Sequence, residues 1–516
     1  MAESKPLRVI ILKPGKYAAD GFVERFRRGF MPNSTLPHLR AMTPARVGAH
    51  ACEVRAIDEY VQTDLRYLDL LHADPSCETL LALVGVQSHQ FQRALDLTAY
   101  ARHHGVRHAV IGGPHPMTCD TTPLHGRGVS FALAEAELVW PDILADAGRG
   151  ELQPVYGAEQ RWQETLVAPP VSPPDARDLR RYVARLLGIY PARGCPYRCN
   201  FCSVIKIAGR QVRSQPIETT LASLRAAQDA GVRFVMFTSD NFNKYPEVNE
   251  LLQAMIDERI RLPFFAQCDA QVEAQEELIA LLARAGCFQM FVGAESFSRE
   301  ALRAAHKLHN HPERYSRIVA LCRAHGITSH FSNIIGFPSD TEAGIEQHLA
   351  TLRELAPDVA SFYILTPIPG TEQYDEFLAG GLITETDLDR FDGSCVTWRH
   401  PNLAPDRLRQ LLFRCYRRFY AAADVSRKLA CLAVSARDFR RTAALLSVAG
   451  CSSLGRYGAA RGIHPMAGGF GRVRRDRLED YLPLRRRRFG LERVPLPASL
   501  ALSARDQRLN EVAKLA

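Results

Sequence analysis

The sequence predicts an α/β protein: a doubly wound parallel sheet, then a second strand–helix region, and finally a mainly helical C-terminal part. Apolar strand segments alternate with helical segments over residues 1–150 and again over 186–370, and this alternation is typical of parallel sheets. Between them, a proline-rich linker at 151–185 can continue neither a helix nor a central strand. With 516 residues, the chain has room for two or three domains.

The N-terminal region contains five apolar segments that suit strands of a buried parallel sheet. Helical periodicity follows at 93–103 and at 135–146. The expected strands are residues 7–12, 52–57, 79–86, 108–111 and 129–133. Doubly wound sheets bind their ligands beyond the carboxyl ends of the strands, so the residues that follow these segments are the candidate ligand contacts.

Two of these strand ends carry suggestive residues. Gln87 and Ser88 follow the third strand, and the paired glycines Gly112 and Gly113 follow the fourth. Glycines without a side chain allow the backbone to approach a large ligand closely. Glycine-rich strand ends occur in many such folds, so this pattern alone does not identify the ligand.

The second region repeats the strand–helix alternation in six units. The expected strands are residues 188–192, 234–238, 264–268, 288–292, 329–335 and 360–365, and the expected helices are 218–230, 248–258, 276–285, 315–325 and 342–354. In barrels built from such units the active residues lie at the carboxyl ends of the strands. Spacing alone does not distinguish a partial barrel from a full one.

Three cysteines lie directly after the first strand of this region, at the spacing C-x3-C-x2-C. Cys195, Cys199 and Cys202 can place three thiolates around three corners of a cubane iron–sulfur cluster, which leaves the fourth iron open to bind a small molecule. A zinc site would require a fourth Cys or His, and the next dozen residues contain none.

This loop, with the aromatic Phe201 before its last cysteine, resembles the cluster loop of the radical S-adenosylmethionine (SAM) superfamily. The resemblance implies a partial (β/α)6 barrel and a 4Fe–4S cluster that chelates SAM and cleaves it to a 5'-deoxyadenosyl radical. It also implies that polar residues at the strand ends contact SAM, although Asp and Ser often cap helices instead. The implied SAM contacts are Phe201, Ser239, Asp240, Glu295, Ser296 and Asn333.

The N-terminal region resembles the cobalamin-binding domain that precedes the barrel in one large radical SAM subclass. That resemblance implies cobalamin contacts at Gln87, Ser88, Gly112, Gly113 and Glu135. Ala134 departs from the usual glycine, and the D-x-H-x-x-G loop that supplies a lower cobalt ligand in many cobalamin proteins is missing. A degenerate sheet that only packs against the barrel is the alternative.

The resemblance to cobalamin-dependent radical SAM enzymes implies a C-methyltransferase that acts on an unactivated carbon of a small metabolite, natural-product precursor or lipid. It also implies an external electron donor of the flavodoxin or ferredoxin type. Three alternatives stay open: a radical cyclase or rearrangement enzyme without methyl transfer, a non-catalytic corrinoid-binding regulator, and a methylthiotransferase. The last would need a second cluster, for which Cys52, Cys77 and Cys119 are the available ligands.

Composition limits the remaining possibilities. The 13 cysteines are scattered apart from the trio, which suits a reducing compartment, and we expect a cytoplasmic protein because neither a signal peptide nor a run of about 18 apolar residues is found. The net charge of +9 is concentrated in arginines near the C-terminus, where interleaved acidic residues favour a solvated, partly paired tail over a nucleic-acid site. Residues 371–516 are expected to form a mainly helical domain with this basic tail, including helices at 407–423 and 426–448.

Overall fold

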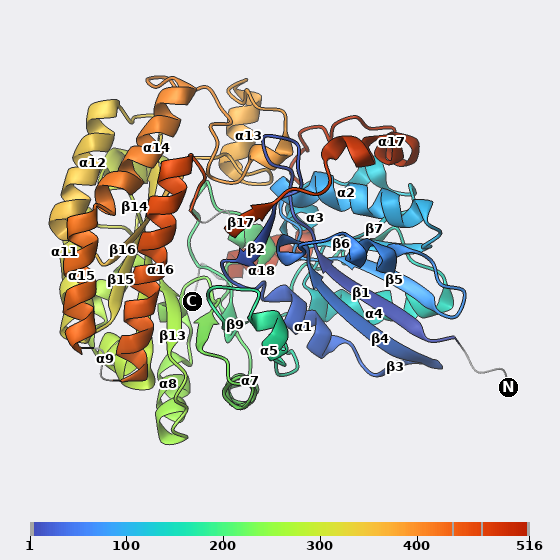
Figure 1. The fold of residues 1–516 in the computed structure, drawn as a ribbon, viewed down its shortest axis with the longest axis horizontal. Coiled ribbons are helices and arrows are strands. Elements are labelled where there is room, and N and C mark those ends of the chain that lie inside the picture. Colours follow the sequence, from blue (N-terminus) through green and yellow to red (C-terminus); the bar gives the residue numbers. More distant parts are fainter. Residues whose placement is uncertain (1–4, 436–437, 466–467, 513–516) are drawn as a thin grey trace.

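The computed structural model describes residues 5–435, 438–465 and 468–512. It is an α/β protein with two separate, largely parallel sheets that lie side by side, each covered by helices (Figure 1). The N-terminal sheet has seven strands and the second sheet has six. No helix within the described ranges is long and apolar enough to cross a membrane.

The N-terminal sheet has the strand order β3-β4-β1-β5-β6-β7-β8. Its strands are β1 (Leu7–Lys13), β3 (Arg46–Val47), β4 (His50–Asp58), β5 (Glu78–Leu83), β6 (His108–Gly112), β7 (Ser130–Ala132) and β8 (Val155–Tyr156). All neighbours are parallel except β3 and β4. Strand β8 lies within the segment that the sequence predicts to be a linker, and a two-residue strand is too short to leave a periodic signal.

Helices cover both faces of this sheet, as the sequence predicts. Ile10 and Leu12 of β1 face the core that contains α2 (Ser88–His103), whereas Val9 and Ile11 face the core that contains α1 (Thr35–Met42) and α4 (Ala136–Arg149). Alternate residues of a strand point to opposite faces, so a strand that is apolar on both sides must be covered twice. The short helices α3 (Pro114–Thr118) and α5 (Ala176–Leu179) follow β6 and β8.

The second sheet is open and entirely parallel, in the order β16-β15-β14-β13-β12-β9. Its strands are β9 (Leu186–Ile189), β12 (Phe234–Phe237), β13 (Phe264–Cys268), β14 (Cys287–Glu295), β15 (Thr328–Ile335) and β16 (Val359–Ile364). The helices that alternate with them are α7 (Ile217–Asp229), α8 (Val248–Asp257), α9 (Glu276–Ala285), α10 (Arg299–Ala304), α11 (Tyr315–Ala324), α12 (Glu342–Leu355) and α13 (Glu372–Ala379). The antiparallel pair β10 (Ala192–Arg193) and β11 (Arg213–Ser214) brackets α6 (Val204–Ile207).

Helix α14 (Pro405–Phe419) covers the edge strand β16 in an unusual way. The hydroxyl of Tyr416 accepts a hydrogen bond from the backbone N–H of Phe362 at 3.0 Å and donates one to its carbonyl at 3.1 Å. The hydroxyl of Tyr420, which follows the helix, does the same for Ala360, at 3.1 Å and 2.8 Å. These hydroxyls satisfy backbone groups that an edge strand otherwise leaves open to pairing with another chain.

The structure differs from the prediction in the following segment. Two helices, α15 (Ala422–Ser435) and α16 (Phe439–Arg461), replace the single helix predicted over 426–448. The physical reason is Asp438, whose carboxylate accepts the Arg441 backbone N–H at 2.8 Å and so caps the start of a new helix. The N-terminal half of α16 packs Ala443 and Ala444 against Phe288, near the amino end of β14.

The remaining C-terminal residues return to the N-terminal sheet. β17 (Gly469–Val473) pairs with β2 (Arg25–Gly29), α17 (Leu478–Phe489) packs on α2, and α18 (Ala504–Val512) follows. The expectation of a solvated basic tail is wrong for part of this segment. Arg485 is fully buried in an ion pair with Asp96. Asp96 is almost four hundred positions away, so sequence inspection does not reveal it as the partner.

Candidate active site

The three motif cysteines lie together in the loop after β9 and β10. The backbone N–H of Cys202 bonds the carbonyl of Cys199 at 3.1 Å, which closes the loop. Burial raises the pKa of Cys195 and of Cys202 to about 12 and also raises that of Cys199. Such thiols lose their protons only in exchange for a cation, and three clustered sulfur donors suit a soft, iron-containing group.

The loop is held by the ends of neighbouring strands. Asp240, just after β12, accepts the Gly194 backbone N–H at 3.1 Å, and Asn241 donates from Nδ2 to the sulfur of Cys195 at 3.0 Å. Gly194 has a φ of +111°, and a Cβ atom there would lie 2.1 Å from the carbonyl oxygen of Gln211. Only glycine permits this turn into the loop.

Across the described ranges, no three His, Cys, Asp or Glu side chains are grouped as ligands of one metal ion. A cubane cluster does not need such convergence, because each cysteine binds a different corner of it. The three clustered thiols therefore fit an iron–sulfur cluster better than they fit a single zinc ion.

Glu295 occupies the end of β14 in a left-handed conformation, with a φ of 62°. Its carboxylate accepts the ammonium of Lys307 at 2.9 Å and the hydroxyl of Ser332 at 3.1 Å. The Lys307 Nζ in turn lies 5.9 Å from the ring centre of Phe201 in the cysteine loop. A non-glycine residue adopts this costly conformation only where the surrounding structure holds it there, and the strand end of Glu295 lies near the cysteine loop through Lys307.

Three other predicted SAM contacts bond within the protein. The Ser239 hydroxyl donates to the carbonyl of Ala192 at 2.9 Å, and the Ser296 hydroxyl accepts the backbone N–H of Ser298 at 3.1 Å. Asn333 is fully buried and accepts from Nε2 of His348 on α12 at 3.0 Å, so its side chain faces the outer helix layer. Contact of Phe201, Ser239, Asp240, Glu295, Ser296 and Asn333 with SAM stays a prediction.

A cavity of about 380 Å³ separates the two sheets at their carboxyl ends. Gly112 and Gly113 line it from the N-terminal sheet, and Tyr190, Arg193 and Asp240 line it from the second sheet. The cavity extends between helix α4 and the strands β5, β6 and β7, and there its walls are mainly apolar. Polar groups beside the cysteine loop thus face this cavity from the side opposite the N-terminal sheet. We call the second sheet with its cysteine loop the cysteine domain, and the 380 Å³ cavity the slot.

The other predicted cobalamin contacts have different surroundings. Ser88 is buried, with its hydroxyl 3.0 Å from Nδ1 of His115, whereas Gln87 is exposed at the start of α2. Glu135 lines the 380 Å³ cavity and accepts both Nη1 and Nη2 of Arg213, each at 2.9 Å. Cobalamin contact by Gln87, Ser88, Gly112, Gly113 and Glu135 stays a prediction.

Sequence reasoning missed the ion pairs that join the two sheets at this cavity. Arg193 donates to Glu137 at 2.7 Å, and His38 from α1 lies 2.7 Å from the same carboxylate oxygen. Burial would raise the pKa of Glu137, but Arg193 and His38 outweigh burial and lower it. The stretch Glu135-Ala-Glu137 can be recognised in the sequence. Its partners cannot, because they lie on distant elements.

A second cavity, of about 540 Å³, adjoins the first and shares Tyr190 and Thr238 with it. Other residues that line it come from distant segments of the chain and include Lys13, Lys16, His89, Tyr363 and Asp392. The ammonium of Lys16 pairs with the carboxylate of Asp392, so that part of the wall is neutral. Gln87, a predicted cobalamin contact, also lines it. Sequence reasoning could not reveal the cavity itself, because it exists only after the two sheets have packed.

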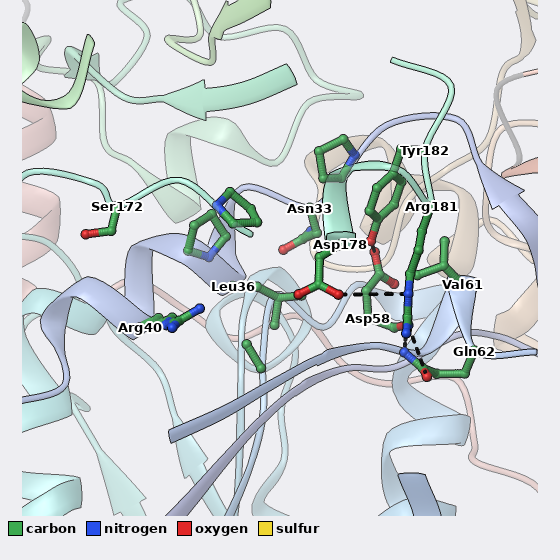
Figure 2. Close-up of a pocket in the computed structure, with 14 residues that line it drawn as sticks. Asn33, Leu36, Arg40, Asp58, Val61, Gln62, Ser172, Asp178, Arg181 and Tyr182 are labelled. Atoms are coloured by element: carbon green, nitrogen blue, oxygen red, sulfur yellow. Dashed lines mark hydrogen bonds and ion pairs between the residues drawn. The ribbon is translucent and has the colours of Figure 1, made fainter. Parts of the chain in front are cut away.

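A third cavity, of about 70 Å³, lies between the linker and the N-terminal sheet (Figure 2). The Tyr182 hydroxyl donates to Asp58 at 2.7 Å, and Arg181 donates to Gln62 at 3.4 Å. None of the predicted site residues lines it. These contacts join the linker to the sheet, and Asp58 and Tyr182 also line the 540 Å³ cavity.

Comparison with known proteins agrees with this geometry. Residues 189–352 match the radical SAM superfamily. The chain is 27% identical over 331 residues to the bacteriochlorophyllide d C-12(1)-methyltransferase of Chlorobaculum tepidum, which covers 62% of this chain and 70% of that protein. It is 28% identical over 249 residues to the hopanoid C-2 methylase of Rhodopseudomonas palustris, which covers 47% of this chain and 46% of that one.

Two solved structures share the fold. TsrM from Kitasatospora setae, a radical S-adenosylmethionine methyltransferase, superposes with a TM-score of 0.56 at 18% identity and covers 74% of this chain and 78% of its own. OxsB, a cobalamin-dependent S-adenosylmethionine radical enzyme, superposes with a TM-score of 0.58 at 14% identity and covers 94% and 79%.

The fold and the cysteine loop define a radical SAM enzyme. With its N-terminal doubly wound sheet, the chain also shares the two-sheet fold of TsrM and OxsB.

Proposed function

We propose that this enzyme is a cobalamin-dependent C-methyltransferase that methylates an unactivated carbon of a small metabolite, natural-product precursor or lipid. The observation that carries the proposal is the 380 Å³ cavity, which is bounded on one side by Gly112 and Gly113 and on the other by residues of the cysteine domain. A corrinoid in this slot would face the cysteine loop. The methyltransferase relatives support the same reading.

The residues present fit both groups. Cys195, Cys199 and Cys202 would hold the cluster, and the open six-stranded sheet would serve as the partial (β/α)6 barrel around SAM. Gly113 has a φ of +131°, and a Cβ atom there would lie 2.2 Å from the backbone nitrogen of Val86, so only glycine lets these two backbone segments pack together at the edge of the cavity. When bound, the cluster supplies one-electron cleavage of SAM and cobalamin supplies a transferable methyl group.

The protein's own residues hold the cysteine loop in place and exclude water from the site. Asp240 and Asn241 fix the entry of the cysteine loop, and the Lys307–Glu295 pair places a buried, compensated charge beside it. Apolar walls around the first cavity exclude water from radical chemistry. The substrate would occupy the adjoining 540 Å³ cavity, which shares Tyr190 and Thr238 with the first. The electron donor would be a flavodoxin or ferredoxin.

Anaerobic reconstitution of the full chain with iron, sulfide and hydroxocobalamin tests the proposal. After desalting, we expect the ultraviolet–visible spectrum to show both a cluster band and a corrin band. Cys199→Ala should lose the cluster, whereas Cys431→Ala, at an exposed position on α15, should keep it. A wild-type protein with a cluster and no corrin would refute the cobalamin assignment and, with it, methyl transfer.

The alternatives make different predictions. Formation of 5'-deoxyadenosine without methylated product would indicate a cyclase or rearrangement enzyme, and full function of Cys199→Ala would indicate a non-catalytic regulator. A methylthiotransferase needs a second cluster, but Cys52 and Cys77 lie at the amino ends of β4 and β5, whereas Cys119 follows α3 beyond the carboxyl end of β6. Opposite ends of a parallel sheet cannot supply one cluster. Thirteen free cysteines suit a reducing, cytoplasmic setting.

A further inference from the structure

The loop of three cysteines is braced from outside by a residue that neither the motif nor the barrel pattern identifies. Arg210 donates from Nη2 to the carbonyl oxygen of Pro196 at 2.8 Å and from Nε to the same oxygen at 3.3 Å. Pro196 directly follows Cys195, and the Cys195 backbone N–H bonds the carbonyl of Gly209 at 3.1 Å. The guanidinium of Arg210 therefore fixes the peptide that leads out of the first cysteine.

Arg210 is oriented in turn by the C-terminal helix α18. Its backbone N–H donates to Oδ1 of Asn510 at 2.8 Å, and its Nη1 donates to the Asn510 carbonyl at 3.3 Å. These bonds connect residues three hundred positions apart. Arg210 thus bonds the cysteine loop through Nη2 and Nε and helix α18 through Nη1.

Helix α18 is firmly attached to the body of the protein. Asp506 is fully buried and accepts the backbone N–H of Arg161 at 3.2 Å. Arg161 also donates to the carbonyl of Ala501 at 2.6 Å, and its own carbonyl accepts the Glu135 backbone N–H at 2.6 Å. A continuous chain of hydrogen bonds therefore runs from the 380 Å³ cavity, where Glu135 lies, through α18 to the cysteine loop.

We propose that α18 is a positioning element of the active site: Asn510 orients Arg210, and Arg210 both fixes the cysteine loop and raises the reduction potential of the cluster that the loop binds. The inference rests on the proposed function, because it concerns that cluster. A fixed positive charge beside a thiolate ligand stabilises the more negative, reduced cluster more than the oxidised one. Arginine keeps its charge at all accessible pH values, so the effect is permanent.

Redox titration of the reconstituted full-length protein, followed by electron paramagnetic resonance without SAM, tests the inference. For Arg210→Met, we expect the ratio of reduced to oxidised cluster at the wild-type midpoint to fall about tenfold, which corresponds to about 59 mV for one electron. Arg210→Lys should restore most of the ratio, because it keeps the charge. Asn510→Ala should lower it about threefold, because Arg210 loses its orientation. Arg508→Met is the matched control, an exposed arginine on the same helix, and should change nothing.

Each outcome decides something. A midpoint unchanged in both Arg210→Met and Asn510→Ala would overturn the inference, and so would an equal shift in Arg508→Met, which would indicate a general effect of surface charge. If Arg210→Met fails to fold, Asn510→Ala decides alone. A wild-type protein that binds no iron would instead overturn the proposed function itself, so the two failures are distinguishable.

Discussion

At the scale of single residues, Gly113 is a position where the backbone leaves no room for a side chain. Its φ of +131° is suited to glycine, and a Cβ atom would lie 2.2 Å from the nitrogen of Val86 and 2.6 Å from the carbonyl carbon of Gly85. We expect Gly113→Ala to lower the free energy of unfolding by roughly 3–5 kcal/mol and to abolish corrin retention.

Gly126 provides the control for that prediction, because it has a φ of +73° but open space around it. Gly126→Ala should cost only about 1–2 kcal/mol, the intrinsic penalty of the left-handed conformation. Urea unfolding monitored by circular dichroism measures both. Equal costs would show that the contact with Val86 relaxes and that Gly113 is not required by close packing.

His330 in β15 makes stability depend on pH. Burial lowers its pKa to about 3, and its Nδ1 lies 2.9 Å from the amide nitrogen of Gln289 and its Nε2 lies 2.8 Å from the hydroxyl of Ser361. In the unfolded chain His330 binds a proton near pH 6.5, whereas in the folded protein it does not. The free energy of unfolding therefore has its full value above pH 6.5 and decreases as the pH falls toward 3.

The change to test is His330→Gln. Between pH 7.5 and pH 5.0 the wild-type protein should lose about 2 kcal/mol more of its free energy of unfolding than the variant does. Urea melts at the two pH values measure the difference. His103→Gln, at an exposed position of α2, is the control and should keep the wild-type dependence. Parallel losses in wild type and His330→Gln would contradict the assignment.

At the scale of elements, the edge strand β16 depends on two tyrosines of the C-terminal region. Tyr416→Phe leaves the backbone N–H of Phe362 without its partner, whereas the Phe362 carbonyl keeps Nε2 of His464 at 2.7 Å. Tyr420→Phe leaves both the N–H and the carbonyl of Ala360 without their partner. We expect each change to cost about 1–3 kcal/mol in the free energy of unfolding. Hydrogen exchange of the Ala360 and Phe362 amides should accelerate in the corresponding variant. Tyr457→Phe on α16, half-buried, is the control and should leave both amides protected.

At the scale of the whole molecule, Glu135 ties the N-terminal sheet to the cysteine domain through Arg213 and Arg193. Glu135→Gln removes the carboxylate, so the nearly buried Arg213 guanidinium keeps only the carbonyls of Gln163 and Ala208 and loses its charged partner, which typically costs about 3–5 kcal/mol. We expect corrin retention to fall while the iron content of the cluster is unchanged, because the cysteine loop has its own supports. Glu151→Gln, at an exposed position, should retain both. Loss of iron and corrin together would indicate global unfolding.

Much of the fold and the core of the site could be predicted from the sequence. The strand–helix alternation is a local property, because period-two and near-period-four patterns reflect burial of one face. It placed β13 and α9 at their observed bounds and the other strands of the second sheet within a few residues. The cysteine loop is equally local: three ligands within eight residues need no long-range contact to be recognised.

Tertiary structure decided the rest. Whether Asn333 faces inward or toward α12 depends on the strand register, and a one-residue shift reverses it. The arginine partners of Glu135 and Glu137 and the brace of α18 on the cysteine loop join segments separated by about 55 to 300 residues. The larger cavity is lined by residues as distant as Lys13 and Gly468. The sequence by itself determined the chemistry, because its ligands are contiguous. Only the packed structure forms the two cavities in which we propose that this chemistry meets cobalamin and the substrate, because they lie between elements that no local pattern relates.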